Sequence, residues 1–149
     1  MELIDILKGI ELFRGLSTEQ LSRLAAISHL ETYPADAVIF SQGSPGDKMY
    51  VIARGEIEVR FQDHKGVAHS AIYLGAGQLF GEMALLDQGE RSASVIAVQD
   101  GTEVYAISSR DFLALCQADT ALGFIMMRNM ALDLSFKLRH RNLDPATGL

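Results

Sequence analysis

Glycine is distributed unevenly along the 149-residue chain, and this constrains the fold more than any other feature of the sequence. Nine of the 13 glycines lie between Gly43 and Gly101, whereas the two flanking segments are glycine-poor. Glycine weakens helix interiors and permits the left-handed backbone conformation that many tight turns require. The sequence therefore predicts a central body of short strands and turns between two helical ends.

Alternation of apolar and charged residues is clearest over residues 56–61, where Ile57, Val59 and Phe61 alternate with charged neighbours. This period of two is typical of a strand with one buried face. No long helical pattern separates consecutive strands, so the sequence favours an antiparallel sandwich or barrel over a parallel sheet. Further segments rich in β-branched or aromatic residues, separated by turn signals, are 37–40, 49–53, 67–74, 94–98 and 103–107.

The N-terminal flank has helical periodicity. Apolar residues share a helical face over residues 3–10. Ser17 is followed by Gln20 three residues later, a capping-box spacing that predicts a helix over residues 18–28.

The C-terminal flank predicts two more helices, over residues 108–141 in all. Ser108 or Ser109 can cap the first of them. Asp119 or Thr120 can cap the second, which we expect to run to about Arg141. Basic residues in its last turns suit the negative end of a helix dipole.

Composition narrows the class of protein. Thirteen basic and 19 acidic residues give a formal net charge of −6, which disfavours direct binding to nucleic acid. Cys116 is the only cysteine, so no intrachain disulfide can form. The most apolar stretch, 121–134, is interrupted by Arg128 and Asp133 and is too short to span a bilayer. We expect a cytoplasmic protein without membrane contact.

The segment 80–93 carries the most informative chemistry. Gly81 precedes an apolar, helix-competent run over residues 83–86, which predicts free backbone N–H groups where an anion is favoured. Glu82 stands beside this site, and its carboxylate can accept a hydrogen bond from a sugar hydroxyl. Arg91 comes after a turn and before an apolar strand, where a guanidinium can pair with phosphate oxygens. Ser92 adds a hydroxyl, and Ala93 adds a backbone donor.

This segment resembles the phosphate-binding cassette of cyclic nucleotide-binding domains, whose pattern is Phe-Gly-Glu, an apolar pair, a spacer and Arg-Ser/Thr/Ala-Ala. The resemblance extends over about residues 12–141. The segment looks especially similar to that of the bacterial catabolite-activator branch. It includes the 39–43 turn and the 49–55 segment. The residues that match the cassette pattern are Gly81, Glu82, Ala84, Leu85, Arg91, Ser92 and Ala93.

The resemblance implies an α+β fold, an antiparallel β-roll of jelly-roll type with about eight strands and flanking helices. It implies one domain over residues 1–149, with the roll over about 30–107. The function that it implies is non-catalytic: a sensor that binds cAMP or possibly cGMP, needs no other cofactor, and acts on an effector protein through its C-terminal helix.

The resemblance also assigns roles to individual residues. Glu82 would accept the ribose 2′-hydroxyl, and Arg91 would pair with the cyclic phosphate. The remaining members of the expected ligand-binding set are Gly81 and Ala93 near the phosphate and ribose, Ser92 on the phosphate, Val59 and Leu74 against the base, and Met83.

Two features depart from the catabolite-activator pattern. Transcription factors of this family continue into a helix-turn-helix domain, and we expect none here because the sequence ends at Leu149. The positions at which that branch reads adenine with hydroxyl side chains are occupied by Lys137 and Leu138, neither of which is an obvious adenine reader.

The last predicted helix contains more apolar residues than one narrow stripe can hold. A subset recurs at steps of three and four residues, as in a helix–helix seam. We expect this helix to form a homodimer or to fold over the bound base. The seam residues are Met127, Met130 or Ala131, Leu134 and Leu138.

Two alternatives remain open from the residues. A cupin-like enzyme would share the roll shape, but it needs a His-x-His metal motif, and the four histidines contain none. We therefore expect no metal site. The second alternative is an interaction module that has lost ligand binding; the presence of both Glu82 and Arg91 argues against it.

Overall fold

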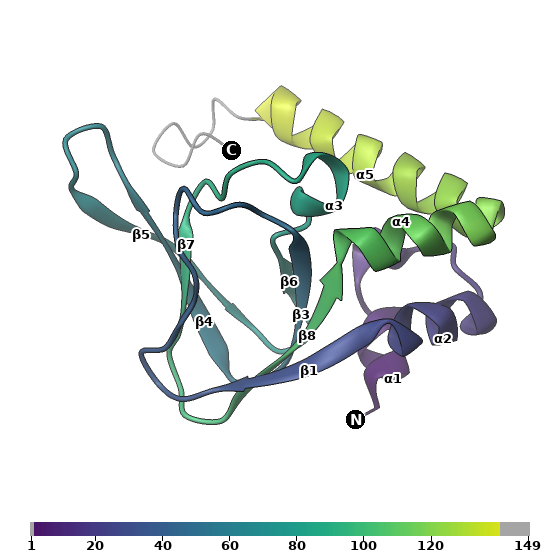
Figure 1. Cartoon of the computed structure of the whole chain (residues 1–149), viewed down its shortest axis with the longest axis horizontal. Helices are drawn as coiled ribbons and strands as arrows, with labels where there is room; N and C mark the ends of the chain where they lie inside the picture. Colours follow the sequence, from purple (N-terminus) through teal and green to yellow (C-terminus); the bar gives the residue numbers. More distant parts are fainter. Residues whose placement is uncertain (1, 141–149) are drawn as a thin grey trace.

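Eight strands form two four-stranded antiparallel sheets in the computed structural model, which describes residues 2–140. The sheets face each other as a β-roll, with helices at one side (Figure 1). One sheet has the order β1 (Ser28–Tyr33), β8 (Thr102–Ser108), β3 (Lys48–Arg54) and β6 (Leu79–Phe80). The other has the order β2 (Val38–Phe40), β7 (Ser94–Ala97), β4 (Glu56–Gln62) and β5 (Ala68–Gly75).

The antiparallel β-roll expected from the sequence is therefore confirmed. The six strand segments predicted from composition and alternation all form, with ends within one residue of those expected. Two strands were not predicted individually. β1 lacks a regular alternation of burial, and β6 has only two residues, so neither gives a period-two signal.

The helices lie mainly beyond the β1–β8–β3–β6 sheet, and α5 passes close to α3 in the view of Figure 1. At the N-terminal end these are α1 (Leu3–Lys8), a 3-10 turn η1 (Glu11–Phe13) and α2 (Thr18–Ala26). The others are α3 (Ala84–Asp87), α4 (Ser109–Ala118) and α5 (Thr120–His140). Arg141, the expected end of the last helix, lies outside the described residues.

Helix starts follow the predicted caps. The Ser17 hydroxyl accepts from the Gln20 backbone N–H at 3.1 Å, and the Gln20 side chain accepts from the Ser17 N–H at 2.9 Å. The Ser108 hydroxyl caps α4. The expected end of α2 was wrong: it stops at Ala26 because Ser28 already pairs with β8 as the first residue of β1.

Two apolar clusters fill the protein. One joins the N-terminal helices, α4 and α5 to the outer face of the β3–β8 region. The other lies inside the roll and includes Tyr50, Ile57, Phe80 and Val95. The site residues described below sit near the second cluster, at the edge where α5 approaches the roll.

The first half of α5 is anchored in the helical core. Met126 is fully buried, and the buried Asn129 side chain donates to the Leu12 and Arg14 carbonyls at 2.8 Å each. Met130 is only 3% exposed. Its expected place in a seam was therefore wrong, and the alternative position, Ala131, is the exposed one.

None of the helices within residues 2–140 combines the length and apolar character that a membrane crossing requires.

Candidate functional site

Arg91 is buried inside the roll, with only 7% of its surface exposed. It precedes β7, and its guanidinium reaches toward the start of β3. Nη2 donates to the Lys48 carbonyl at 2.7 Å, and Nη1 makes a longer contact of 3.4 Å with the Gly81 carbonyl. Nε is buried and has no acceptor among the described residues. Arg91 thus keeps donors that its own chain does not use.

The turn at Gly81 gives the guanidinium its space. Gly81 has a φ of +77°, in the left-handed region that favours glycine. A Cβ at this position would lie 2.8 Å from Arg91 Nη1 and 3.2 Å from the Lys48 carbonyl oxygen. Glycine is therefore required here by both the backbone conformation and the approach of Arg91.

Two aromatic rings lie near the buried cation, and a third packs against them. The Arg91 Cζ lies 4.0 Å from the centroid of the Phe40 ring and 5.9 Å from that of Tyr50. Tyr50 stacks on Phe80 with a centroid distance of 4.9 Å. Burial lowers the pKa of Arg91 and raises the pKa of Tyr50 to about 12. The arginine remains a cation at neutral pH, because its pKa starts so high.

Glu82, the next residue after Gly81, is paired with a residue of α5. Lys137 Nζ lies 2.8 Å from Glu82 Oε1 and 3.1 Å from Asp133 Oδ2. Burial disfavours the charge on Lys137, but the Glu82 and Asp133 carboxylates together outweigh this, and the pKa of Lys137 is raised. Glu82 is thus held by an ion pair to Lys137 of α5, which lies 55 residues further along the chain.

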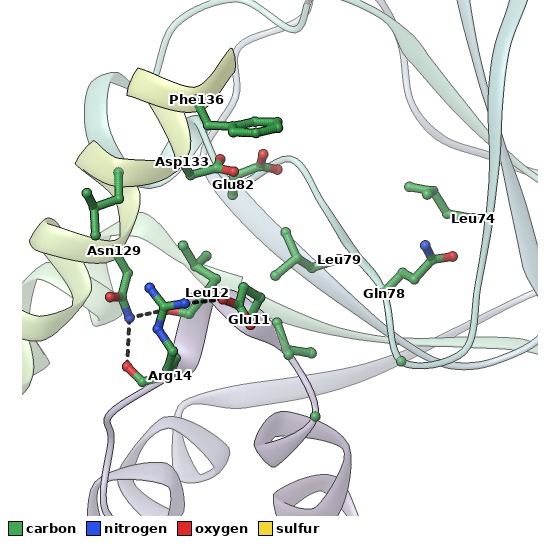
Figure 2. A pocket seen from close by; sticks show the side chains of 14 residues that line it. Glu11, Leu12, Arg14, Leu74, Gln78, Leu79, Glu82, Asn129, Asp133 and Phe136 are labelled. Atoms are coloured by element: carbon green, nitrogen blue, oxygen red, sulfur yellow. Dashed lines mark hydrogen bonds and ion pairs between the residues drawn. The ribbon is translucent and has the colours of Figure 1, made fainter. Parts of the chain in front are cut away.

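A cavity of about 600 Å³ opens beside Glu82. In Figure 2, Asp133 and Phe136 of α5 lie near Glu82 at one end, and Glu11 and Arg14 lie at the other. Leu74, Gln78 and Leu79 line a further side. Arg91 is not among the residues that line this cavity. The cavity is therefore lined by Glu82, the residue expected at the ribose, and not by Arg91, the residue expected at the phosphate.

The free backbone N–H groups predicted for the start of the helix lie just before it. α3 starts at Ala84, and the N–H groups of Ala84 and Leu85 are already bonded to the carbonyls of Gly81 and Glu82. The N–H groups of Glu82 and Met83 have no acceptor among residues 2–140. Free donors exist at this turn, but they precede the helix instead of belonging to its first turn.

The other expected site residues differ in how far they are exposed to solvent. Ser92 is exposed and Ala93 half-buried, and their N–H groups also have no acceptor among the described residues. Val59 and Leu74 pack half-buried against the apolar cluster inside the roll. Met83 is 40% exposed. The structure brings Arg91 and Gly81 into contact and places Glu82 and Leu74 on one cavity.

Three residues make contacts at the site that the sequence did not predict. Phe40 contacts Arg91, although the sequence marks it only as part of the 37–40 strand segment and the 39–43 turn. Asp133 and Lys137 are four residues apart, a spacing that signals a helical ion pair, but nothing in it points to Glu82. Lys137 does not stand free to read a base, and Leu138 is 65% exposed.

A protein metal site usually requires several clustered His, Cys, Asp or Glu side chains. No group of three or more His, Cys, Asp or Glu side chains that could hold a metal ion occurs within residues 2–140. His69 contacts Asp63 across the β4–β5 hairpin at 3.0 Å, and the two form an isolated pair.

The roll therefore holds a buried arginine, a neighbouring glutamate and amides without an acceptor among the described residues, and groups of this kind can donate hydrogen bonds to or pair with an anion or a hydroxyl. The sequence pattern of the family described as "Cyclic nucleotide-binding domain" matches residues 30–119. The chain belongs to this family.

Individual relatives agree with this assignment. The chain is 38% identical over 139 residues to a cyclic AMP receptor protein of Thermus thermophilus, covering 93% of this chain and 62% of that one. It is 30% identical over 114 residues to a cGMP-dependent protein kinase of Drosophila melanogaster, covering 75% of this chain and 15% of the kinase.

Solved structures show the same fold. The crystal structure of the Thermus thermophilus catabolite activator protein superimposes with a TM-score of 0.80 at 36% identity, over 90% of this chain and 61% of that one. The chain thus spans less than two thirds of the length of these relatives.

Proposed function

We propose that this chain, as a single domain over residues 1–149, binds cAMP and passes the bound state to an effector protein through α5. The observation that carries the proposal is Arg91: a buried cation with unused donors, at a glycine turn that also carries Glu82. A cation kept away from water is stabilised by an anionic ligand that supplies the missing hydrogen bonds. We propose no catalytic activity and no metal or other cofactor.

The proposed ligand set retains the residues expected from the sequence. Arg91 and Ser92 bind the cyclic phosphate, and Glu82 accepts from the ribose 2′-hydroxyl. The unbonded N–H groups near the site support further phosphate or ribose contacts. The remaining members of the set are Gly81, Met83 and Ala93 near the phosphate, and Val59 and Leu74 near the base.

Base preference is proposed as cAMP ahead of cGMP. The relative of highest quoted identity is a cyclic AMP receptor protein, and a cGMP-dependent kinase follows at lower identity. Neither Lys137 nor Leu138 offers adenine a hydroxyl, so we expect the preference to be modest. A preference for cGMP greater than about tenfold, equivalent to about 1.4 kcal/mol, would reverse this ranking.

Calorimetric titration with cAMP, cGMP and linear AMP tests the proposal. At about 100 times Kd, ligand stabilises the fold by roughly 2.7 kcal/mol. For a domain of this size, that is a rise in Tm of roughly 5–11 °C. We expect this rise with a cyclic nucleotide and little with AMP. No rise at millimolar cAMP or cGMP would leave the interaction-module alternative as the better description.

We propose that the outer face of α5 pairs with a second copy of the chain. Phe124 is 69% exposed, Met127 36% and Leu138 65%. Together with Ala131 and Leu134, they follow the alternating three- and four-residue steps of a two-helix seam. Phe124→Lys should produce a monomer in light scattering while leaving cAMP binding intact. A wild-type monomer at high concentration would refute the pairing.

The remaining proposals concern location and other partners. We propose a cytoplasmic protein that contacts neither membrane nor nucleic acid directly. The acidic net charge of −6 supports the absence of direct nucleic-acid binding, because it opposes attraction to phosphate backbones.

A further inference from the structure

The position of the Arg91 guanidinium is fixed by three separate segments of the chain. The Lys48 carbonyl at the start of β3 accepts from Nη2, and the Gly81 carbonyl after β6 accepts from Nη1. The third contact comes from Phe40 at the end of β2, whose ring centroid lies 4.0 Å from Arg91 Cζ. The two carbonyls hold the ends of the guanidinium, and the ring contacts its carbon centre.

Phe40 is itself held in place by the rings inside the roll. Its ring centroid lies 5.8 Å from that of Tyr50 and 5.9 Å from that of Phe80. Its backbone is paired with Val95 of β7. A cation and an aromatic ring attract each other most strongly where water is excluded, as it is around the 7%-exposed Arg91. The ring therefore stabilises one position of a long and otherwise adaptable side chain.

We propose that Phe40 is a positioning residue for the anionic part of the ligand, acting through Arg91. By fixing the guanidinium before the ligand arrives, the ring reduces the side-chain entropy that phosphate binding would otherwise cost. This inference rests on the proposed function. It implies that Phe40 favours ligands with a negative charge and does nothing for an uncharged ligand with the same base and ribose.

The test compares cAMP with adenosine, which lacks the phosphate, on the wild type and on Phe40→Leu. Leucine keeps an apolar side chain and removes the ring. We expect Phe40→Leu to weaken cAMP binding about three- to thirtyfold, in the range of a desolvated cation–π contact. Adenosine affinity, measured by NMR titration, should stay the same. Phe40→Tyr keeps the ring and should restore cAMP binding.

Phe80→Leu is the matched control, because Phe80 belongs to the same ring cluster and stacks on Tyr50. We expect it to lower Tm with a smaller change in the ratio of adenosine to cAMP affinity. If Phe40→Leu fails to fold, as judged by circular dichroism, Phe40→Met and Phe40→Tyr supply the comparison between a flexible apolar side chain and a ring.

A double-mutant cycle with Arg91→Ala decides whether Phe40 acts through Arg91. We expect Phe40→Leu to cost nothing further in the Arg91→Ala background. Equal weakening of cAMP and adenosine, an undiminished cost in that background, or an equal effect of Phe80→Leu would each overturn the inference. If the wild type binds no cyclic nucleotide, the proposed function fails; if it binds cAMP but the affinity ratio does not respond to Phe40, only this inference fails.

Discussion

The two charged residues of the candidate site are held in different ways. The contacts of Arg91 come from within the roll: two carbonyls and an aromatic ring. Glu82 is paired with Lys137, which belongs to α5. The side chains of Glu82 and Lys137 are 17% and 34% exposed, so their pair is partly open to water. The proposed phosphate end is therefore built into the roll, whereas the position of the proposed ribose end depends on where α5 lies.

This difference suggests how ligand binding is coupled to α5. A ligand changes a conformational equilibrium only through contacts that differ between the two states. The first half of α5 is anchored through Asn129 and the buried core, while Lys137 in the second half contacts the site itself. A ribose hydroxyl that competes for Glu82 would weaken the contact of this second half with the roll.

Removing the phosphate end should have the largest effect. We expect Arg91→Ala to weaken cAMP binding by about 2–5 kcal/mol, by analogy with buried charge pairs. This corresponds to roughly 30-fold to several thousand-fold in Kd. The substitution also removes the Arg91 donors from the Lys48 and Gly81 carbonyls, of which the second keeps its bond from the Ala84 N–H, so Tm should fall as well.

Arg91→Lys is the control for this loss. It keeps the charge but cannot reproduce the planar fork, so its affinity should lie between those of wild type and Arg91→Ala. Calorimetry at a temperature where all three proteins are folded gives the comparison. Wild-type affinity in Arg91→Ala would show that the phosphate binds elsewhere.

Removing the ribose end should have a smaller effect. We expect Glu82→Ala to weaken cAMP binding by about 1.5–3 kcal/mol, the scale of a hydrogen bond to a charged group. The sharper measurement uses 2′-deoxy-cAMP, which lacks the hydroxyl. It should bind wild type less tightly than cAMP does, and the two ligands should bind Glu82→Ala equally. If 2′-deoxy-cAMP still bound less tightly than cAMP to Glu82→Ala, the assignment of Glu82 to the ribose hydroxyl would be wrong.

The sequence predicted the strands and the residues of the candidate site, but not the contacts that hold Arg91 and Glu82, for physical reasons. The roll was predictable because strand alternation at Ile57, Val59 and Phe61 and the turn glycines are local signals. Arg91, Gly81 and Glu82 were identifiable because they fall within one short pattern. The Lys137–Glu82 pair and the ring of Phe40 on Arg91 were not, because each joins residues more than 50 positions apart. Contacts of that kind depend on tertiary packing and leave no mark in local periodicity.

Releasing the ribose end from α5 should change affinity in the opposite direction. Lys137→Met keeps the length of the side chain and removes the ammonium that now occupies Glu82 Oε1. Partly exposed ion pairs contribute about 0.2–1 kcal/mol, so cAMP should bind up to about fivefold tighter. Arg139→Met, on the exposed part of the same helix, is the control and should leave Kd unchanged. Weaker binding by Lys137→Met would mean that Lys137 assists the ligand.

Weakening the start of α5 should affect folding and hardly affect binding. Asp119 Oδ1 accepts the Leu122 N–H at 3.0 Å, and Asp119 also pairs with Arg23 of α2. The backbone hydrogen bond, then the arginine, lower the pKa of the Asp119 carboxyl. Because its folded-state pKa lies below the unfolded value of about 3.9, its contribution to stability is present above that pH and is lost as the pH falls through the folded-state pKa.

Asp119→Asn should therefore lower Tm at pH 6 and have progressively less effect toward pH 2.5, so that the two curves of Tm against pH converge. Asparagine can still cap a helix but cannot form the ion pair, which restricts the difference to the charge. Since Asp119 lies at the end of α5 remote from Lys137, cAMP affinity at pH 7 should match that of wild type. If affinity fell along with Tm, ligand binding would depend on the whole length of α5, and the division between its anchored first half and its ligand-coupled second half would be wrong.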